Sequence, residues 1–167
     1  MNETKKLRVA LFFGGVSSEH EVSCVSASTW LRALAQAPCA DRYEVFPVGI
    51  TKQGRWLACS PTPEAMADGS WEKGADCTPC VLSPDRTDHG IWLLKDGKAE
   101  LVHIDICAPV MHGKNGEDGT IQGLFELARI PYVGCGVLGS AVCMDKAVAN
   151  TIMDAAGVPH CKWASAI

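Results

Sequence analysis

The stretch Leu7-Arg-Val-Ala-Leu-Phe-Phe13, followed directly by Gly14-Gly15, decides the fold class of this chain. A run this apolar is typical of a strand that is buried on both faces of a parallel sheet. The next residues, Ser18-Glu-His-Glu21, have the pattern of a capping box, in which the Ser18 hydroxyl accepts a bond from the third helical N–H and Glu21 reaches back to the cap. The pattern predicts a strand, a glycine turn and a helix in that order.

The same order of elements occurs again later in the chain. The apolar segment Ile104–Met111 runs straight into a glycine-punctuated loop, His112–Gly119. Both following helices carry apolar residues at the offsets that place them on one buried face. These stripes are Cys24, Ala27, Trp30, Leu31 and Leu34 in the first helix, and Ile121, Leu124, Phe125 and Ala128 in the second.

Shorter elements are predicted around these two units. Strands are expected at 43–50, 55–57, 79–82, 90–94, 98–102 and 131–134, with hairpin turns at 51–54 and 96–97 and one short helix within 59–76. A last helix carries the stripe Met144, Val148, Ile152 and Ala155 and ends at Gly157-Val-Pro159. This order predicts an α/β fold, an open parallel sheet with helices on both faces in a Rossmann-like arrangement, with an inserted β-hairpin region at 51–102 that decorates it.

The composition is that of about one globular domain. The chain has 167 residues, of which 47% are hydrophobic and 20% charged, and its formal net charge is −4. No basic run is longer than Lys5-Lys6, so neither nucleic acid nor a membrane surface is expected as a partner. The apolar stretch Val9–Phe13 is too short for a signal peptide or a membrane span, and a cytoplasmic location is therefore expected.

The cysteines suggest reduced thiols. There are nine, an odd number at irregular spacing, which does not fit a disulfide framework. Cys77-Thr-Pro-Cys80 could be half of a zinc ribbon or a redox dithiol, but no second pair follows at ligand spacing. We expect two incidental loop cysteines there and no metal site in this chain.

Two loops are expected to meet where the strands end, because ligands bind at the carboxyl ends of such sheets. In residues 14–23, Glu21 is the capping partner, so Glu19 is free to point across the crevice and attract a cation such as a ligand ammonium. The alternative for Glu19 is an acid that only offsets the helix dipole. His112 lies where a buried strand surfaces; it is a candidate ligand contact, and otherwise a hydrogen-bonded structural histidine.

Together these loops resemble a known family. Gly14-Gly-x-Ser-x-Glu-x-Glu-Val-Ser23, His112-Gly-x-x-Gly-Glu-Asp-Gly-Thr-Ile-Gln-Gly123 and Cys143-Met-Asp-Lys146 resemble motifs in the amino-terminal part of the D-alanine:D-alanine ligases. The resemblance implies an ATP-grasp enzyme that uses ATP and Mg²⁺. It phosphorylates one D-alanine and joins it to a second through an acyl phosphate, for peptidoglycan and cell-wall synthesis.

The resemblance also implies residue roles. Glu19 and His112 are expected to be catalytic and to bind the first D-alanine, together with Val22 and Ser23, while Lys146 contacts nucleotide phosphates. Residues 1–139 would form an amino-terminal pre-ATP-grasp domain, and 140–167 would begin a truncated central domain. Two copies would pair through the first of these. Since the family's metal ligands and other phosphate-binding residues lie beyond Ile167, the chain alone is expected to be inactive.

Three alternatives remain at this point. The hairpin Lys52-Gln-Gly-Arg-Trp56 also resembles the D-alanine:D-serine ligases of vancomycin resistance, although other long ligases share it. A free-standing α/β domain for ligand binding or dimerisation is a non-catalytic alternative. A dinucleotide-binding domain is disfavoured, because no G-x-G-x-x-G follows the first strand.

Overall fold

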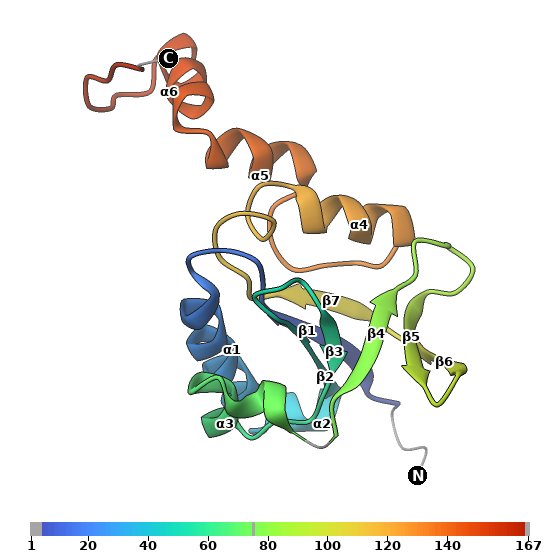
Figure 1. Cartoon of the computed structure of the whole chain (residues 1–167). Coiled ribbons are helices and arrows are strands. Elements are labelled where there is room, and N and C mark those ends of the chain that lie inside the picture. Colours follow the sequence, from blue (N-terminus) through green and yellow to red (C-terminus); the bar gives the residue numbers. More distant parts are fainter. Residues whose placement is uncertain (1–4, 75, 166–167) are drawn as a thin grey trace.

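The structure is a computed structural model that describes residues 5–74 and 76–165. It forms one sheet flanked by helices, with a helical extension at the carboxyl-terminal end (Figure 1). The strands are β1 (Leu7–Gly14), β2 (Tyr43–Ile50), β3 (Trp56–Ala58), β4 (Thr78–Leu82), β5 (Gly90–Lys95), β6 (Lys98–His103) and β7 (Ile106–Pro109). The helices are α1 (His20–Leu34), α2 (Cys39–Arg42), α3 (Pro63–Ala67), the 3-10 helix η1 (Ser70–Lys73), α4 (Thr120–Ala128), α5 (Val137–Met144) and α6 (Lys146–Ala155).

The sheet is mixed, with the strand order β6-β5-β4-β3-β2-β1-β7. β1 pairs in parallel with both β2 and β7, which confirms the parallel core. The strands of the inserted region pair antiparallel. The turns between β2 and β3 and between β5 and β6 are too short for the crossover that parallel neighbours need, whereas the longer connection from β3 to β4 carries α3 and η1. The insertion therefore extends the main sheet, so that the expected open parallel sheet is a mixed one.

Side chains of β1 alternate between two cores, as expected for a strand covered on both faces. Phe12 packs with Phe125 of α4, their ring centroids 5.2 Å apart. Phe13 points the other way and packs against Trp71 of η1, with centroids 4.8 Å apart. Figure 1 shows α1 and α3 on one side of the sheet and α4 on the other, which confirms the prediction of helices on both faces.

The helix α1 begins differently from the prediction. Its N-cap is Glu19, and no side chain caps it. Glu21 does not reach back toward the cap, because it forms an ion pair with Lys52 of the β2–β3 hairpin. The predicted stripe is confirmed in part: Cys24 and Ala27 are buried and Leu31 packs against the core, but Trp30 is 38% exposed.

The last third of the chain also differs from its prediction. The strand expected at 131–134 is a single parallel bridge between Tyr132 and Cys107. The helix α5 was missed, and the expected last helix is α6, which begins where the Asp145 carboxylate accepts hydrogen bonds from the N–H groups of Ala147 and Val148.

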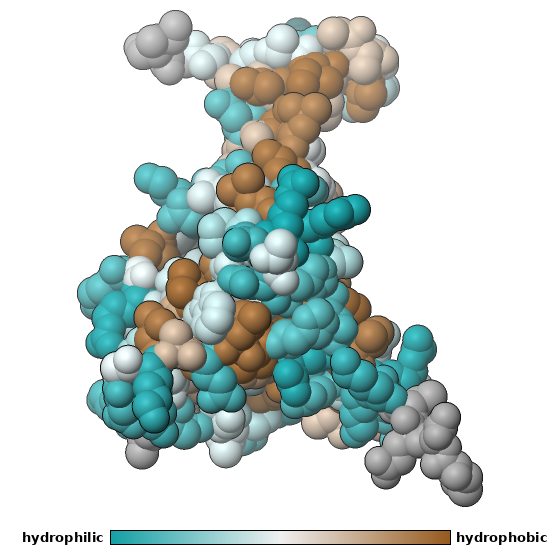
Figure 2. Space-filling model, turned by 90° about the vertical axis from the view of Figure 1, so that its right-hand side faces the viewer, coloured by the Kyte–Doolittle hydropathy of each residue, from teal (hydrophilic) through white to brown (hydrophobic). Residues whose placement is uncertain are grey.

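Helices α5 and α6 form a helical arm (residues 137–155) that projects away from the sheet (Figure 1). Figure 2 shows apolar surface gathered along it. The exposed apolar side chains of the arm are Val137, Leu138, Met144, Val148 and Ile152. Among the residues described, no helix combines the length and the hydropathy needed to cross a membrane.

Candidate functional site

The candidate site lies at the carboxyl edge of the sheet, where β1 leads into residues 15–19 and β7 leads into residues 112–119. The structure confirms that the two loops are in contact. The Ser17 hydroxyl donates to the His112 carbonyl oxygen over 2.9 Å. The Glu19 carboxylate lies so close to Gly113 that a Cβ atom there would be 2.7 Å from its Oε2 atom. Gly113 has φ +69°, a conformation that favours glycine.

Glu19 is exposed at the first turn of α1, with its backbone N–H bonded to the Ser17 hydroxyl at 3.1 Å. Within residues 5–74 and 76–165, no cationic side chain forms an ion pair with its carboxylate. Partial positive charge at the start of a helix makes an acidic side chain favourable there without a cationic partner. The predicted free carboxylate is therefore present, and it faces the loop that carries His112.

Both ring nitrogens of His112 have a neighbour. The Nε2 atom lies 3.0 Å from the Ser26 hydroxyl of α1, and the Nδ1 atom lies 3.7 Å from the Glu117 carboxylate. The other oxygen of Glu117 accepts the Gly113 N–H at 2.7 Å. These contacts fix the plane of the imidazole. Sequence analysis missed Ser26, although it lies three residues after Ser23 and therefore on the same face of α1.

The loop after His112 is held by its own side chains. The Asp118 carboxylate accepts hydrogen bonds from the N–H groups of Asn115 and Thr120, at 2.9 and 3.0 Å. Partial burial raises the pKa of Asp118, but these hydrogen bonds outweigh it and the net direction is downward. The Gln122 amide donates to the Gly116 carbonyl at 2.8 Å. The loop is thus organised before any ligand arrives.

Val22 and Ser23 occupy different environments. Val22 is 55% exposed, one helical turn after Glu19, and its surface is open to a ligand. Ser23 is fully buried, accepts the Gly14 N–H at 2.8 Å and donates to the Val110 carbonyl at 2.5 Å. Because its hydroxyl joins the ends of β1 and β7, Ser23 positions the two loops, and its contact with substrate stays a prediction.

Lys146 is not brought together with these residues. It is exposed at the first position of α6, in the helical arm (Figure 1). Nor do the described parts of the chain contain a cluster of three or more His, Cys, Asp or Glu side chains that could hold a metal ion.

A cavity of about 380 Å³ adjoins His112, between its loop, α1 and the helical arm. Trp30, Gln122 and Ser140 line it. The Gln122 Oε1 atom is buried and has no hydrogen-bond partner among the residues described. Val110, Met111 and His112, which directly follow β7, also line this cavity. The cavity therefore adjoins the carboxyl edge of the sheet.

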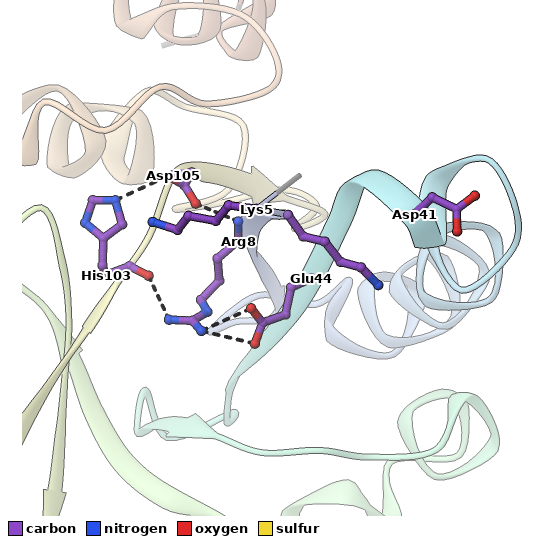
Figure 3. A pocket seen from close by; sticks show the side chains of 7 residues that line it. Lys5, Arg8, Asp41, Glu44, His103 and Asp105 are labelled. Atoms are coloured by element: carbon purple, nitrogen blue, oxygen red, sulfur yellow. Dashed lines mark hydrogen bonds and ion pairs between the residues drawn. The ribbon is translucent and has the colours of Figure 1, made fainter. Parts of the chain in front are cut away.

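A larger hollow, of about 890 Å³, lies at the opposite edge of the sheet (Figure 3). Several of its charged groups already bind one another: the Arg8 guanidinium donates to both oxygens of Glu44, and the Arg8 backbone N–H donates to Asp105 at 2.7 Å. This hydrogen bond lowers the pKa of Asp105. Arg8, Glu44 and Asp105 are thus paired with one another, and they lie where β1 starts rather than where it ends. We therefore place the functional site at the carboxyl edge and not in this hollow.

Comparisons with known proteins identify the family of this chain. The family described as D-ala D-ala ligase N-terminus matches residues 8–135. The chain is 49% identical over 155 residues to a D-alanine--D-alanine ligase of Caldicellulosiruptor bescii, a match that covers 93% of this chain and 41% of the relative. It is 46% identical to a putative D-alanine--D-lactate ligase of Streptomyces coelicolor, covering 92% of this chain and 41% of that protein.

Solved structures give the same result. The crystal structure of the VanG D-Ala:D-Ser ligase from Enterococcus faecalis superposes with a TM-score of 0.83 at 38% identity, over 92% of this chain and 43% of that one. The chain thus spans about two fifths of the length of the relatives it matches. The family match covers 128 residues, from 8 to 135, and the fold and the loop motifs agree with it. The chain therefore belongs to the D-Ala D-Ala ligase N-terminus family.

Proposed function

We propose that this chain is the amino-terminal part of an ATP-dependent D-alanine:D-alanine ligase, a carbon–nitrogen ligase, and that its carboxyl edge binds the first D-alanine. One observation carries the proposal: a carboxylate with no ion pair in the described structure, that of Glu19, faces the His112 loop across the carboxyl edge. A zwitterionic amino acid needs an anionic partner for its ammonium group, and Glu19 supplies it.

In this proposal, each residue acts on one part of the substrate. Glu19 pairs with the ammonium group, the exposed surface of Val22 contacts the methyl group, and His112 orients the bound molecule from the other loop. Holding the substrate in this way lets its carboxylate face the nucleotide, which reduces the entropic cost of the reaction. Ser23, Ser26 and Glu117 position the residues that touch the substrate.

ATP supplies the phosphoryl group that activates the first D-alanine, and the amine of a second D-alanine displaces phosphate from the acyl phosphate. We assign Lys146 to the nucleotide phosphates on its family motif. The residues described do not include a cluster of side chains that could bind Mg²⁺, so we assign them no part in metal binding. Stabilisation of transferring charge is most of the catalysis in phosphoryl transfer. The chain alone is therefore expected to release no phosphate from ATP with D-alanine, and measurable turnover would refute this.

D-alanyl-D-serine synthesis is the second candidate function. It is favoured by the likeness to the VanG D-Ala:D-Ser ligase and by the β2–β3 hairpin, which contains Lys52–Trp56. Both activities begin with the same D-alanine, so the carboxyl edge serves either. Competition between D-alanine and D-serine, with product analysis on the full-length enzyme, separates them. A non-catalytic binding domain remains the alternative if no ligase activity is found there.

The setting follows from the proposed reaction. The dipeptide would enter peptidoglycan, and the enzyme would work in the cytoplasm as a homodimer that pairs through the domain at 1–139, without nucleic acid or membrane. The segment 140–167 would begin the central ATP-grasp domain, and the projection of the helical arm (residues 137–155) away from the sheet supports this.

The experiment that tests the site is an NMR titration of this chain with D-alanine. We expect shifts in the amide signals of residues 15–23 and 112–119, and at least a tenfold weaker Kd in Glu19→Gln. Glu21→Gln is the matched control, because Glu21 lies two residues away and pairs with Lys52 on the surface. Equal binding by the wild type and Glu19→Gln would refute the assignment.

A further inference from the structure

The two cysteines of the Cys77-Thr-Pro-Cys80 motif lie on opposite faces of the sheet. Because the two cysteines are three residues apart along an extended segment, their side chains point to opposite faces. Cys80 is buried in the core beneath α4, while Cys77 packs against the core beneath α1 and α3. The two thiols therefore cannot act as a pair, and the motif does not form a redox dithiol of the kind considered from the sequence.

The neighbour of Cys77 is instead Cys59. Cys59 directly follows β3, and Cys77 directly precedes β4. β3 and β4 are antiparallel, with Leu57 opposite Pro79 and Ala58 opposite Thr78. Continuing this register by one residue places Cys59 directly opposite Cys77. Both belong to the core on the α1 side of the sheet, so their side chains share one face.

Two observations show that this is a non-hydrogen-bonded pair. The Cys59 N–H donates to the Pro47 carbonyl of β2 at 3.2 Å, so the polar backbone of Cys59 faces away from β4. Pro79, two residues along β4 from Cys77, has no N–H to donate. In such pairs the Cα atoms are only about 4.5 Å apart, which lies within the range that disulfides span.

The two thiols differ in access. Cys59 is 6% exposed, whereas Cys77 is half-buried and its thiol donates to the Trp71 carbonyl at 3.2 Å. Burial raises the pKa of both, and the neighbouring Cys77 contributes to the rise at Cys59. Both are free thiols in this structure.

We propose that Cys59 and Cys77 form a cross-strand dithiol that small disulfides of the glutathione type oxidise to an intramolecular disulfide. The more exposed Cys77 thiolate attacks one sulfur of the small disulfide, forms a mixed disulfide and releases one thiolate. The Cys59 thiolate then attacks the Cys77 sulfur and releases the second. The two protons lost by the cysteines go to the two released thiolates, and the small disulfide is the oxidant.

The bond would close the segment 59–77, which carries α3 and η1. Trp71 in this segment packs against Phe13, directly before the Gly14-Gly15 turn of the carboxyl edge. The disulfide would therefore tie down the layer that supports the site. The inference does not depend on the proposed function, since it concerns only the register of β3 and β4 and the burial of two thiols.

The test oxidises the chain with glutathione disulfide and maps its disulfides by mass spectrometry of a non-reducing digest. The exposed thiols are first removed in the background variant Cys135→Ser/Cys143→Ser/Cys161→Ser. We expect a peptide linked through Cys59 and Cys77, a Tm raised by roughly 6 to 12 °C that dithiothreitol reverses, and faster formation at pH 9 than at pH 7.

Variants on this background separate the two steps. Cys59→Ser should stop at one glutathionyl group on Cys77, and Cys77→Ser should lose the disulfide. Cys80→Ser is the matched control and should still form it, since burial raises the pKa of Cys80 to about 12 in the other core. A link from Cys77 to Cys80, or a background protein that accumulates only mixed disulfide, would overturn the proposal. Peptide mapping of the background protein needs no further substitution, so it decides the matter even if a variant misfolds.

Discussion

Replacing Ser23 by alanine tests the view that a buried hydroxyl holds the carboxyl edge together. The side chain accepts the Gly14 N–H at 2.8 Å and donates to the Val110 carbonyl at 2.5 Å, with no exposure to solvent. Ser23→Ala leaves a donor and an acceptor without a partner in the interior, and each stranded group costs about 1 to 3 kcal/mol. We expect the free energy of unfolding to fall by about 2 to 4 kcal/mol, measured by urea denaturation with tryptophan fluorescence.

The matched control is Ser28→Ala on the same helix. Ser28 is also buried, but its hydroxyl donates to the Val25 carbonyl one turn earlier, at 2.7 Å, and accepts only a long hydrogen bond of 3.4 Å from the Arg32 guanidinium. Because a helical carbonyl keeps its backbone hydrogen bond, this change should cost less than about 1 kcal/mol. If Ser23→Ala is no more destabilising than Ser28→Ala, the hydroxyl does not join β1 to β7 and the reasoning fails.

Three further substitutions test the edge. Ser26→Ala removes the contact to Nε2 of His112 and should weaken D-alanine binding severalfold while Tm changes little; an unchanged Kd by NMR titration would count against positioning by Ser26. Gly113→Ala is disfavoured at φ +69° and would push against the Glu19 carboxylate, so we expect a loss of about 1 to 2 kcal/mol in urea denaturation together with weaker binding. The pKa of Asp118 is lowered in the folded chain, so its contribution to stability is present above the ordinary pKa of aspartate and is lost as pH falls through the lowered value. Asp118→Asn should therefore flatten the acid side of a plot of Tm against pH, and an unaltered profile would contradict this.

Several features of the fold could be predicted because their causes are local. The apolar run in β1 and the glycines after it define a buried strand and its turn without reference to the rest of the chain. The capping box failed because Lys52, which follows β2, competes for Glu21. The helix α5 was missed because its apolar residues lack a clear one-face period, and the strand at 131–134 shrank to one bridge at the edge of the sheet.

The contact between the two loops was predicted from the sequence, but the hydrogen bonds that hold them together were not. That residues 14–23 and 112–119 meet follows from two parallel strands ending at one edge, and the sequence indicates this through its order of elements. The roles of Ser23 and Ser26 depend on which face of α1 turns inward toward β7, and no local pattern encodes that.

The sequence by itself determined the α/β class, the two glycine-rich loops at one edge and the acid and imidazole that they carry, because side-chain periodicity and turn chemistry act over a few residues. Only the tertiary structure decided that the inserted strands join the main sheet, that Ser23 links two strand ends, and that Cys77 faces Cys59 rather than Cys80. Those outcomes depend on strand register and on packing between segments far apart in the chain, where a shift of one residue turns every side chain to the other face.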